Sequence, residues 1–230
     1  GATLKLSQSY NPASASGLVM NGGTVEVALA SQASIVPEVG KFDTTGNKKT
    51  LKFSAAHDAD PLNGVAGLNF TTYNTVFDTI ELAHPGNFAA QDITLDSTQT
   101  LEIFADIDAP SGTNKIVTGT ATPIIKITGT TPQDGAIPGV LESTSGTAVS
   151  SDATLDIGAS LANPLNLSTK TVYSTVDITS SNNTTDLTLP NGATLKLSQS
   201  YNPASASGLV MNGGTVEVAL ASQASIVPEV

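Results

Sequence analysis

The sequence contains no cysteine, no arginine and no tryptophan. Without cysteine the chain cannot form disulfides, thiolate zinc sites or a cysteine nucleophile, so its stability must come from an apolar core and backbone hydrogen bonds. All nine basic residues are lysines, against 20 acidic residues, and the formal net charge is −11. Nucleic-acid partners are therefore disfavoured, because phosphate backbones need clustered cations and base edges are read best by arginine.

Long apolar runs are also missing. No stretch approaches the roughly 18 apolar residues that a membrane-spanning helix requires, so we expect no membrane span. The chain begins at Gly1 rather than at methionine, which suggests that a leader or preceding repeats were removed. The acidic composition, rich in threonine and serine, suits solubility outside the cell, and we expect an extracellular or cell-surface location.

Catalytic motifs are lacking as well. The only two histidines, His57 and His84, lie in no recognisable motif, and no nucleophile stands beside a base in a known pattern. We therefore expect that the protein is not an enzyme.

An internal repeat dominates what the sequence does contain. Residues 1–39 recur without a substitution at residues 192–230, an offset of 191 residues. Such identity indicates a recent tandem duplication, a single repeating subunit given together with the start of the next one, or an engineered fusion. In each case the chain holds one period and a piece of the next.

The repeated segment carries two predicted strands, at residues 3–7 and 24–29, which alternate apolar and polar residues. A donated strand satisfies the open backbone groups of a sheet edge. We therefore predict that the 192–230 copy completes the fold, while the 1–39 copy faces or completes a neighbouring unit. The alternative is that the boundaries merely reflect where a tandem array was cut. The predicted interface consists of the apolar residues of both copies: Leu4, Leu6, Val25, Val27, Leu29, Leu195, Leu197, Val216, Val218 and Leu220.

The rest of the chain shows short alternating runs separated by Gly, Pro, Asn and Asp at intervals of about ten residues, which predicts an all-β, antiparallel β-sandwich. The further strands are predicted at residues 50–55, 67–72, 76–82, 101–107, 121–128, 171–179 and 186–189.

The predicted organisation has four parts. They are a strand segment at 1–39, a main sandwich at 40–129, a loop or linker rich in Thr, Ser, Gly and Pro at 130–151, and a second β unit at 152–230. A single sandwich with a long excursion is the alternative.

The segment NGVAGLNFTTYNTVFDTI, residues 63–80, resembles the cohesin-type, Ig-like β-sandwich signature found in prokaryotic extracellular surface and fibre proteins. In that signature a glycine-rich turn leads into a strand followed by Tyr-Asp-Pro and a short apolar run; here Asn74-Thr75 replaces Asp-Pro. Residues 101–108 and 121–128 resemble the next two strands. The resemblance implies a sandwich, and because cohesins bind dockerin modules, it implies a binding module as an alternative function.

Two acidic groups are candidate cation sites. Asp58, Asp60 and Asn63 supply closely spaced oxygen ligands before a glycine turn, so Ca²⁺ is a candidate cofactor, although the spacing is not that of an EF-hand and a solvated turn is the plainer interpretation. Asp106 and Asp108 alternate along one predicted strand and thus share a face, where they either bind a cation or form a solvated edge.

Four asparagines begin an Asn-X-Ser/Thr pattern and are therefore candidate glycosylation acceptors: Asn69, Asn166, Asn182 and Asn183. We expect the loop that carries Asn182 and Asn183 to be exposed.

These observations favour a structural protein, one repeat or subunit of an extracellular fibre, surface layer (S-layer) or giant adhesin, whose partners are identical neighbouring repeats or subunits. The alternative is a module that recognises a protein or a carbohydrate on one sandwich face. Carbohydrate platforms use planar rings, and the sequence offers only four tyrosines and no tryptophan.

Overall fold

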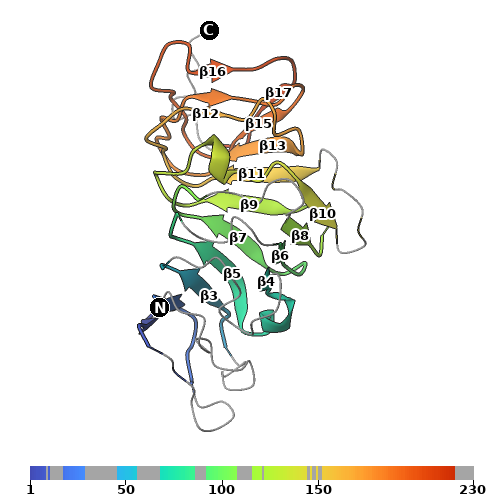
Figure 1. Cartoon of the computed structure of the whole chain (residues 1–230). Helices are drawn as coiled ribbons and strands as arrows, with labels where there is room; N and C mark the ends of the chain where they lie inside the picture. The colour runs from blue at the N-terminus through green and yellow to red at the C-terminus, as the bar shows by residue number, and fades with distance from the viewer. Residues whose placement is uncertain are drawn as a thin grey trace.

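A computed structural model describes residues 1–8, 10, 18–28, 46–55, 68–85, 92–107, 116–120, 122–143, 146, 149 and 152–220. The described chain is all-β, but its strands are parallel and wind into a β-solenoid (Figure 1). The predicted antiparallel β-sandwich, and with it the fold implied by the cohesin resemblance, is therefore wrong.

One parallel sheet of ten strands, the main sheet, runs the length of the molecule. In Figure 1 its strands rise one above another towards β17, which lies near the C-terminus. We call each main-sheet strand, with the chain that leads to the next one, a rung. The main sheet consists of β1 (Thr3–Leu6), β2 (Thr24–Val27), β3 (Lys49–Phe53), β5 (Phe77–Leu82), β7 (Thr100–Ile103), β9 (Ile124–Ile127), β11 (Ala153–Ile157), β13 (Tyr173–Ile178), β15 (Thr194–Leu197) and β17 (Thr215–Val218).

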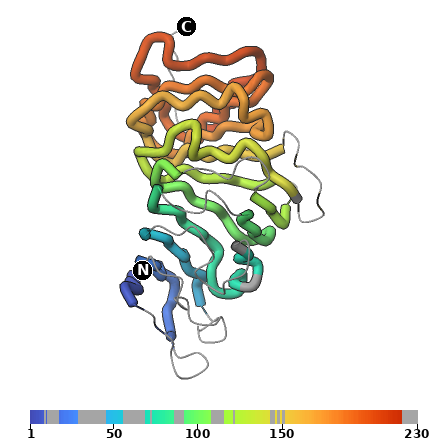
Figure 2. The backbone as a smooth tube through the Cα atoms, viewed as in Figure 1, coloured from blue at the N-terminus to red at the C-terminus, as the bar shows by residue number. Residues whose placement is uncertain are grey.

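A second layer of short strands alternates with the main-sheet strands along the chain. One sheet of this layer has the order β10 (Leu141–Ser143), β8 (Ile116–Thr118), β6 (Ile93–Thr94) and β4 (Leu68–Asn69). The other has the order β12 (Leu165–Asn166), β14 (Leu187–Thr188) and β16 (Leu209–Val210). Two short 3-10 helices, η2 (Thr71–Tyr73) and η3 (Asp134–Ala136), lie in the connections. The continuous path of the backbone around the stack can be followed in Figure 2.

The strands stack in a register that places like residues above one another. Successive side chains of a strand point to opposite faces, so each main-sheet strand contributes two residues to the interior and two to the outer surface. One interior column runs through Leu51, Ile80 and Leu101, and the next through Phe53, Leu82 and Ile103. These six side chains are fully buried. The apolar interior between the two layers is therefore the core that holds the solenoid together.

The outer face of the main sheet carries a column of threonines, whose β-branched side chains favour extended backbone. It comprises Thr3, Thr24, Thr50, Thr79, Thr100, Thr154, Thr175, Thr194 and Thr215, and Ile124 takes the corresponding place in β9.

Turn spacing explains the error in the predicted fold. Each rung from β3 to β15 contains two strands, so turns recur about every ten residues, as they do in a sandwich. The seven further strands predicted between residues 50 and 189 correspond to β3, β4, β5, β7, β9, β13 and β14, with shorter bounds. The predicted linker at 130–151 contains η3 and β10, and the main sheet passes from β9 to β11 across it. Within the described residues no helix is long and apolar enough to cross a membrane.

Candidate functional site

A column of charged residues lies beside the threonine column on the described surface, and we call it the charged column. Each main-sheet strand supplies one member, at the third position of a Thr–apolar–charged–apolar pattern that begins with Ile124 instead of threonine in β9. The members in stacking order are Lys5, Glu26, Lys52, Glu81, Glu102, Lys126, Asp156, Asp177, Lys196 and Glu217.

Ion pairs join neighbouring rungs along this column. The N–O distances are 2.9 Å for Lys5–Glu26, 2.7 Å for Lys52–Glu81, 3.6 Å for Lys126–Glu102 and 3.0 Å for Lys196–Asp177. Each pair is partly exposed and adds little to the free energy of unfolding by itself. Its geometric effect is larger, because a strand that slipped by one residue would place its charge inside the core.

Ser54 and Lys5 reinforce one of these carboxylates. The Ser54 hydroxyl donates a hydrogen bond to Glu26 Oε1 at 2.6 Å, and together with the ammonium group of Lys5 it lowers the pKa of Glu26. Glu26 is thus held by groups from the rungs on both sides of it.

Two places in the charged column set like charges next to each other. At the pair of Asp156 and Asp177, burial is the main cause that raises the pKa of Asp156, and Asp177 raises it further. Thr179 Oγ1 donates to Asp156, while Asp177 Oδ1 is buried without a hydrogen-bond partner among the described residues. At the other place, burial is again the main cause that raises the pKa of Glu102, and Glu81 adds to it.

The two copies of the repeat build the same two rungs at opposite ends of the main sheet. The first copy forms β1 and β2, and the second forms β15 and β17, with identical register. Val25 and Val27 in β2 are fully buried because β3 lies over them, whereas their counterparts in β17, Val216 and Val218, are 43% and 50% exposed. The same sequence is therefore interior at one end of the stack and uncovered at the other.

The predicted interface residues are thus divided. Leu195, Leu197 and Leu6 are buried within the chain, and Leu4 is partly buried. Leu220 is half-buried, and Leu29 lies outside the described residues. Of the predicted interface residues that the structure describes, only Val216 and Val218 are exposed.

The turn before β2 shows what the uncovered rung lacks. Asn47 donates to Asn21 Oδ1 from both its backbone and its side-chain nitrogen at 3.2 Å, and Gly22 N donates to Asn47 O at 3.1 Å. The corresponding residues before β17, Asn212 and Gly213, lie at the edge of the described stack.

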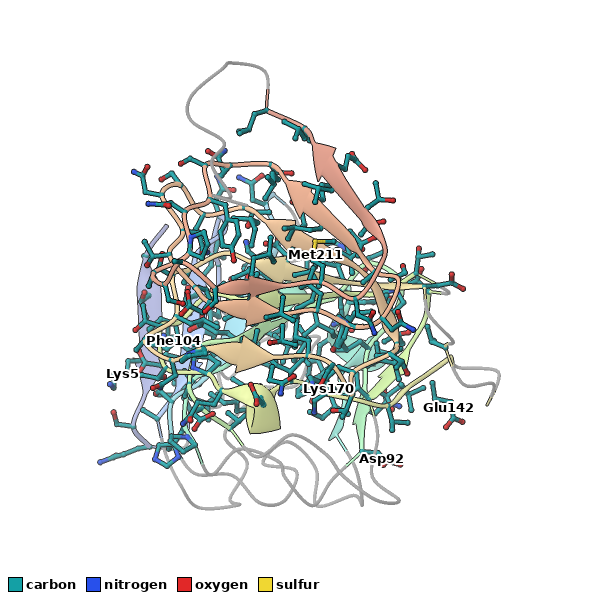
Figure 3. The ribbon with its side chains drawn as sticks, turned by 90° about the horizontal axis from the view of Figure 1, so that it is seen from above. Lys5, Asp92, Phe104, Glu142, Lys170 and Met211 are labelled. Atoms are coloured by element: carbon teal, nitrogen blue, oxygen red, sulfur yellow. The ribbon has the colours of Figure 1, made fainter. Side chains whose placement is uncertain are left out.

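Figure 3 looks along the stack from the C-terminal end. Lys5 and Phe104 lie on one side of the molecule and Glu142 on the other, with Met211 between them (Figure 3). Met211 packs against the apolar interior, as does its counterpart Met20. At β17 the apolar core is therefore exposed at the end of the stack, and the threonine column and the charged column lie beside it on the outer face of the main sheet.

The other predicted sites are only partly described. Asp58, Asp60, Asn63 and Asp108 lie outside the described residues, so the calcium proposal stays a prediction. Asp106 accepts hydrogen bonds from Gln133, at 2.9 Å from the backbone nitrogen and 2.7 Å from the side chain. No group of three or more metal-binding side chains occurs among the residues that the structure describes.

The glycosylation candidates also differ in their surroundings. Asn69, Asn166 and Asn182 are exposed. Asn183 is fully buried; its amide donates to Ala159 O and Ser180 Oγ, and its Oδ1 accepts from Thr185 N. The prediction that this loop is exposed is therefore wrong for Asn183, because its amide is used to join adjacent rungs.

Comparison with known proteins adds no relative: no protein-family model, no curated protein and no solved structure matches the chain.

The charged column was not anticipated from the sequence. Its signal is nonetheless present, since TLKL, TVEV, TLKF, TIEL, TLEI, TLDI and TVDI recur at intervals of about two dozen residues.

Proposed function

We propose that this chain is an extracellular structural protein, one period of a tandem-repeat polymer such as a fibre, a surface layer or a giant adhesin, in which successive periods form one unbroken solenoid. The observation that carries the proposal is the placement of the repeat. Its two copies form the first two and the last two rungs of a single main sheet, in the same register. The second copy therefore stands where the first copy of a following period would stand.

Contacts of the first copy support the continuation. There, Thr50 N donates to Gly23 O at 2.9 Å and Ser54 N donates to Val27 O at 3.0 Å, so β3 closes the edge of β2. A following period would bring the same residues over Gly214 and Val218, which are the counterparts of Gly23 and Val27. Every contact at the junction would then be one that the chain already makes within itself.

The proposal also fixes a repeat distance. One period spans eight main-sheet strands, from β1 to β13. With neighbouring strands about 4.8 Å apart, a period lengthens the rod by roughly 38 Å.

A mechanical role suits this architecture. Each rung contacts only its neighbours, so strength along the rod comes from repeated parallel hydrogen bonds and from the continuous apolar core. The ion pairs between rungs favour the correct register. The acidic composition, rich in threonine and serine, supports the extracellular part of the proposal.

The test is a chain with two periods, made by adding a second copy of residues 40–230 after Val230. We expect small-angle scattering and electron microscopy to show one straight rod, longer than the single-period rod by about 38 Å. The control replaces Val216 and Val218 with lysine in the two-period chain, which should break the core at the junction and let the halves hinge. Two separate bodies in the unmodified two-period chain would contradict the proposal.

A further inference from the structure

We propose that the edge strand β17 binds the edge strand β1 of a second copy of this chain, in parallel register, so that separate chains associate end to end. The inference goes beyond the proposed function, because it requires no covalent continuity between periods. The register would place Thr3, Leu4, Lys5 and Leu6 of the second copy beside Thr215, Val216, Glu217 and Val218.

The first argument is the uncovered apolar end of β17. Val216 and Val218 are about half exposed, although the same residues in β2 are fully buried when another strand lies over them. Leu4 and Leu6 of β1 already pack beside Val25 and Val27 across the β1–β2 pairing. Leucine beside valine is therefore a pairing that this core accommodates, and the β1 edge of a second copy supplies it.

The second argument is charge. Within the described residues no lysine forms an ion pair with Glu217, since Lys196 pairs with Asp177 on its other side. Lys5 pairs with Glu26 and its side chain is still 59% exposed at the opposite end of the stack. Docking would give the order Lys196, Glu217, Lys5, Glu26 across the junction, in which each charge has only opposite neighbours. This complementarity favours a second copy of the chain itself as the partner.

The third argument is the direction of the backbone groups. In the second copy of the repeat, Ser198 N donates to Ile178 O at 3.1 Å, which shows that this side of the strand faces the preceding rung. Its counterpart Ser7 follows β1 directly, at the end of the described sheet, and carries the same backbone donor. Val218 O is the counterpart of Val27 O, which accepts from the following rung. The donors of β1 and the acceptors of β17 therefore match.

Strand exchange is the competing arrangement. The 192–230 segment of one chain has the sequence needed to replace residues 1–39 of another. In such an exchange, β17 of one chain would replace β2 of the other chain against β3, with identical residues in contact. The displaced segment would lose its β1–β2 pairing, so exchange yields no net gain in contacts. Among the described strands, β1 and β17 each pair on one side only, so end-to-end docking covers both edges and breaks no pairing in this part of the chain. It is therefore the arrangement that these contacts favour.

The test is sedimentation velocity on the full 230-residue chain across a wide concentration range. We expect the mean mass to rise with concentration. Glu217→Lys, which would face Lys5 of the second copy, should weaken association by about tenfold or more. Asp152→Lys, the same charge change at an exposed residue away from both ends, is the control and should leave association unchanged.

A charge swap and an apolar pair of variants make the test specific. Lys5→Glu should weaken association on its own. Combined with Glu217→Lys it should restore association, because positions 5 and 217 again carry opposite charges at the junction. Val216→Asp should abolish association, whereas Ile124→Asp, at a similarly exposed apolar residue in the middle of the main sheet, should not. Far-UV circular dichroism checks that each variant keeps its fold.

Three results would overturn the inference. These are a chain that stays monomeric at every concentration, association that is indifferent to Glu217→Lys, and fibres that repeat every eight strands, about 38 Å, rather than every ten, about 48 Å. The last result would mean strand exchange. A monomeric single-period chain together with a straight two-period rod would refute end-to-end docking and leave the proposed function standing.

Discussion

Identical residues in different surroundings allow an unusually direct stability test. Val25 and Val216 occupy the same position of the repeated segment, with the same residues on either side in sequence. Val25 is fully buried beneath β3, and Val216 is 43% exposed at the end of the stack. Replacing each with alanine removes the same two methyl groups, so any difference in destabilisation reports the covering rung alone.

The expected difference follows from burial. Each buried methyl group contributes about 0.8 kcal/mol, so Val25→Ala should lose roughly 1.6 kcal/mol of transfer free energy. The cavity adds up to about 1 kcal/mol, which brings the total to roughly 2–3 kcal/mol. At Val216 only about half of the transfer free energy is lost, and water fills the space of the removed methyl groups. The loss in free energy of unfolding should therefore stay below about 1 kcal/mol.

Urea denaturation followed by circular dichroism, at a protein concentration low enough to keep chains separate, measures both costs. Hydrogen exchange of the β2 and β17 amides shows whether the loss is local to the end rungs, as it can be in a stack of nearest neighbours. Equal destabilisation by the two substitutions, or a larger effect at Val216, would refute the argument that β17 is an uncovered interior rung.

Three further predictions use the same kind of comparison. Because burial raises the pKa of Asp156 above its ordinary value of 3.8, the folded state holds this proton more tightly than the unfolded state. The carboxyl group therefore costs stability as pH rises from about 4, and Asp156→Asn should flatten the fall in urea midpoint between pH 4 and 7. Gly23→Ala should cost more than about 2 kcal/mol in thermal unfolding, since its Cβ would overlap Ala2 O, whereas Gly192→Ala, also at positive φ but with open space, should cost about 1 kcal/mol. Tyr201→Phe removes a buried 2.9 Å hydrogen bond to Thr185 O and should cost about 1 kcal/mol, while the same change at its exposed counterpart Tyr10 should be near neutral.

The local structure of this chain could be predicted better than its topology. Alternation in TLKL and TVEV correctly indicates strands with one buried face, and glycines before β2 and β17 correctly indicate turns. Parallel and antiparallel pairing, however, use the same alternation and the same turn residues. What distinguishes them here is a long-range property: the order Thr, apolar, charged, apolar returns once per rung, and only a parallel stack places these columns in line.

The uncovered rung could be anticipated in part. Val216 and Val218, which the structure shows to be exposed, were among the predicted interface residues, and their role in an interface stays a prediction. The sequence could not show that Leu195 and Leu197 would be buried within their own chain, because burial depends on which rung lies next to them. Nor could it show that Asn183 is interior, since an Asn-Thr-Thr pattern is the same in an exposed loop and in a hydrogen-bonded corner.

The ends of a solenoid normally need capping rungs whose outer face is polar, because an interior rung left open exposes core. In this chain one sequence forms both ends, and β2 shows that this sequence is an interior one, with Val25 and Val27 fully buried. A segment selected to be covered cannot also serve as a cap, and its copy in β17 exposes the same two valines. A following period or a second chain laid over that rung would remove the exposed apolar surface, and both proposals rest on the exposure of Val216 and Val218.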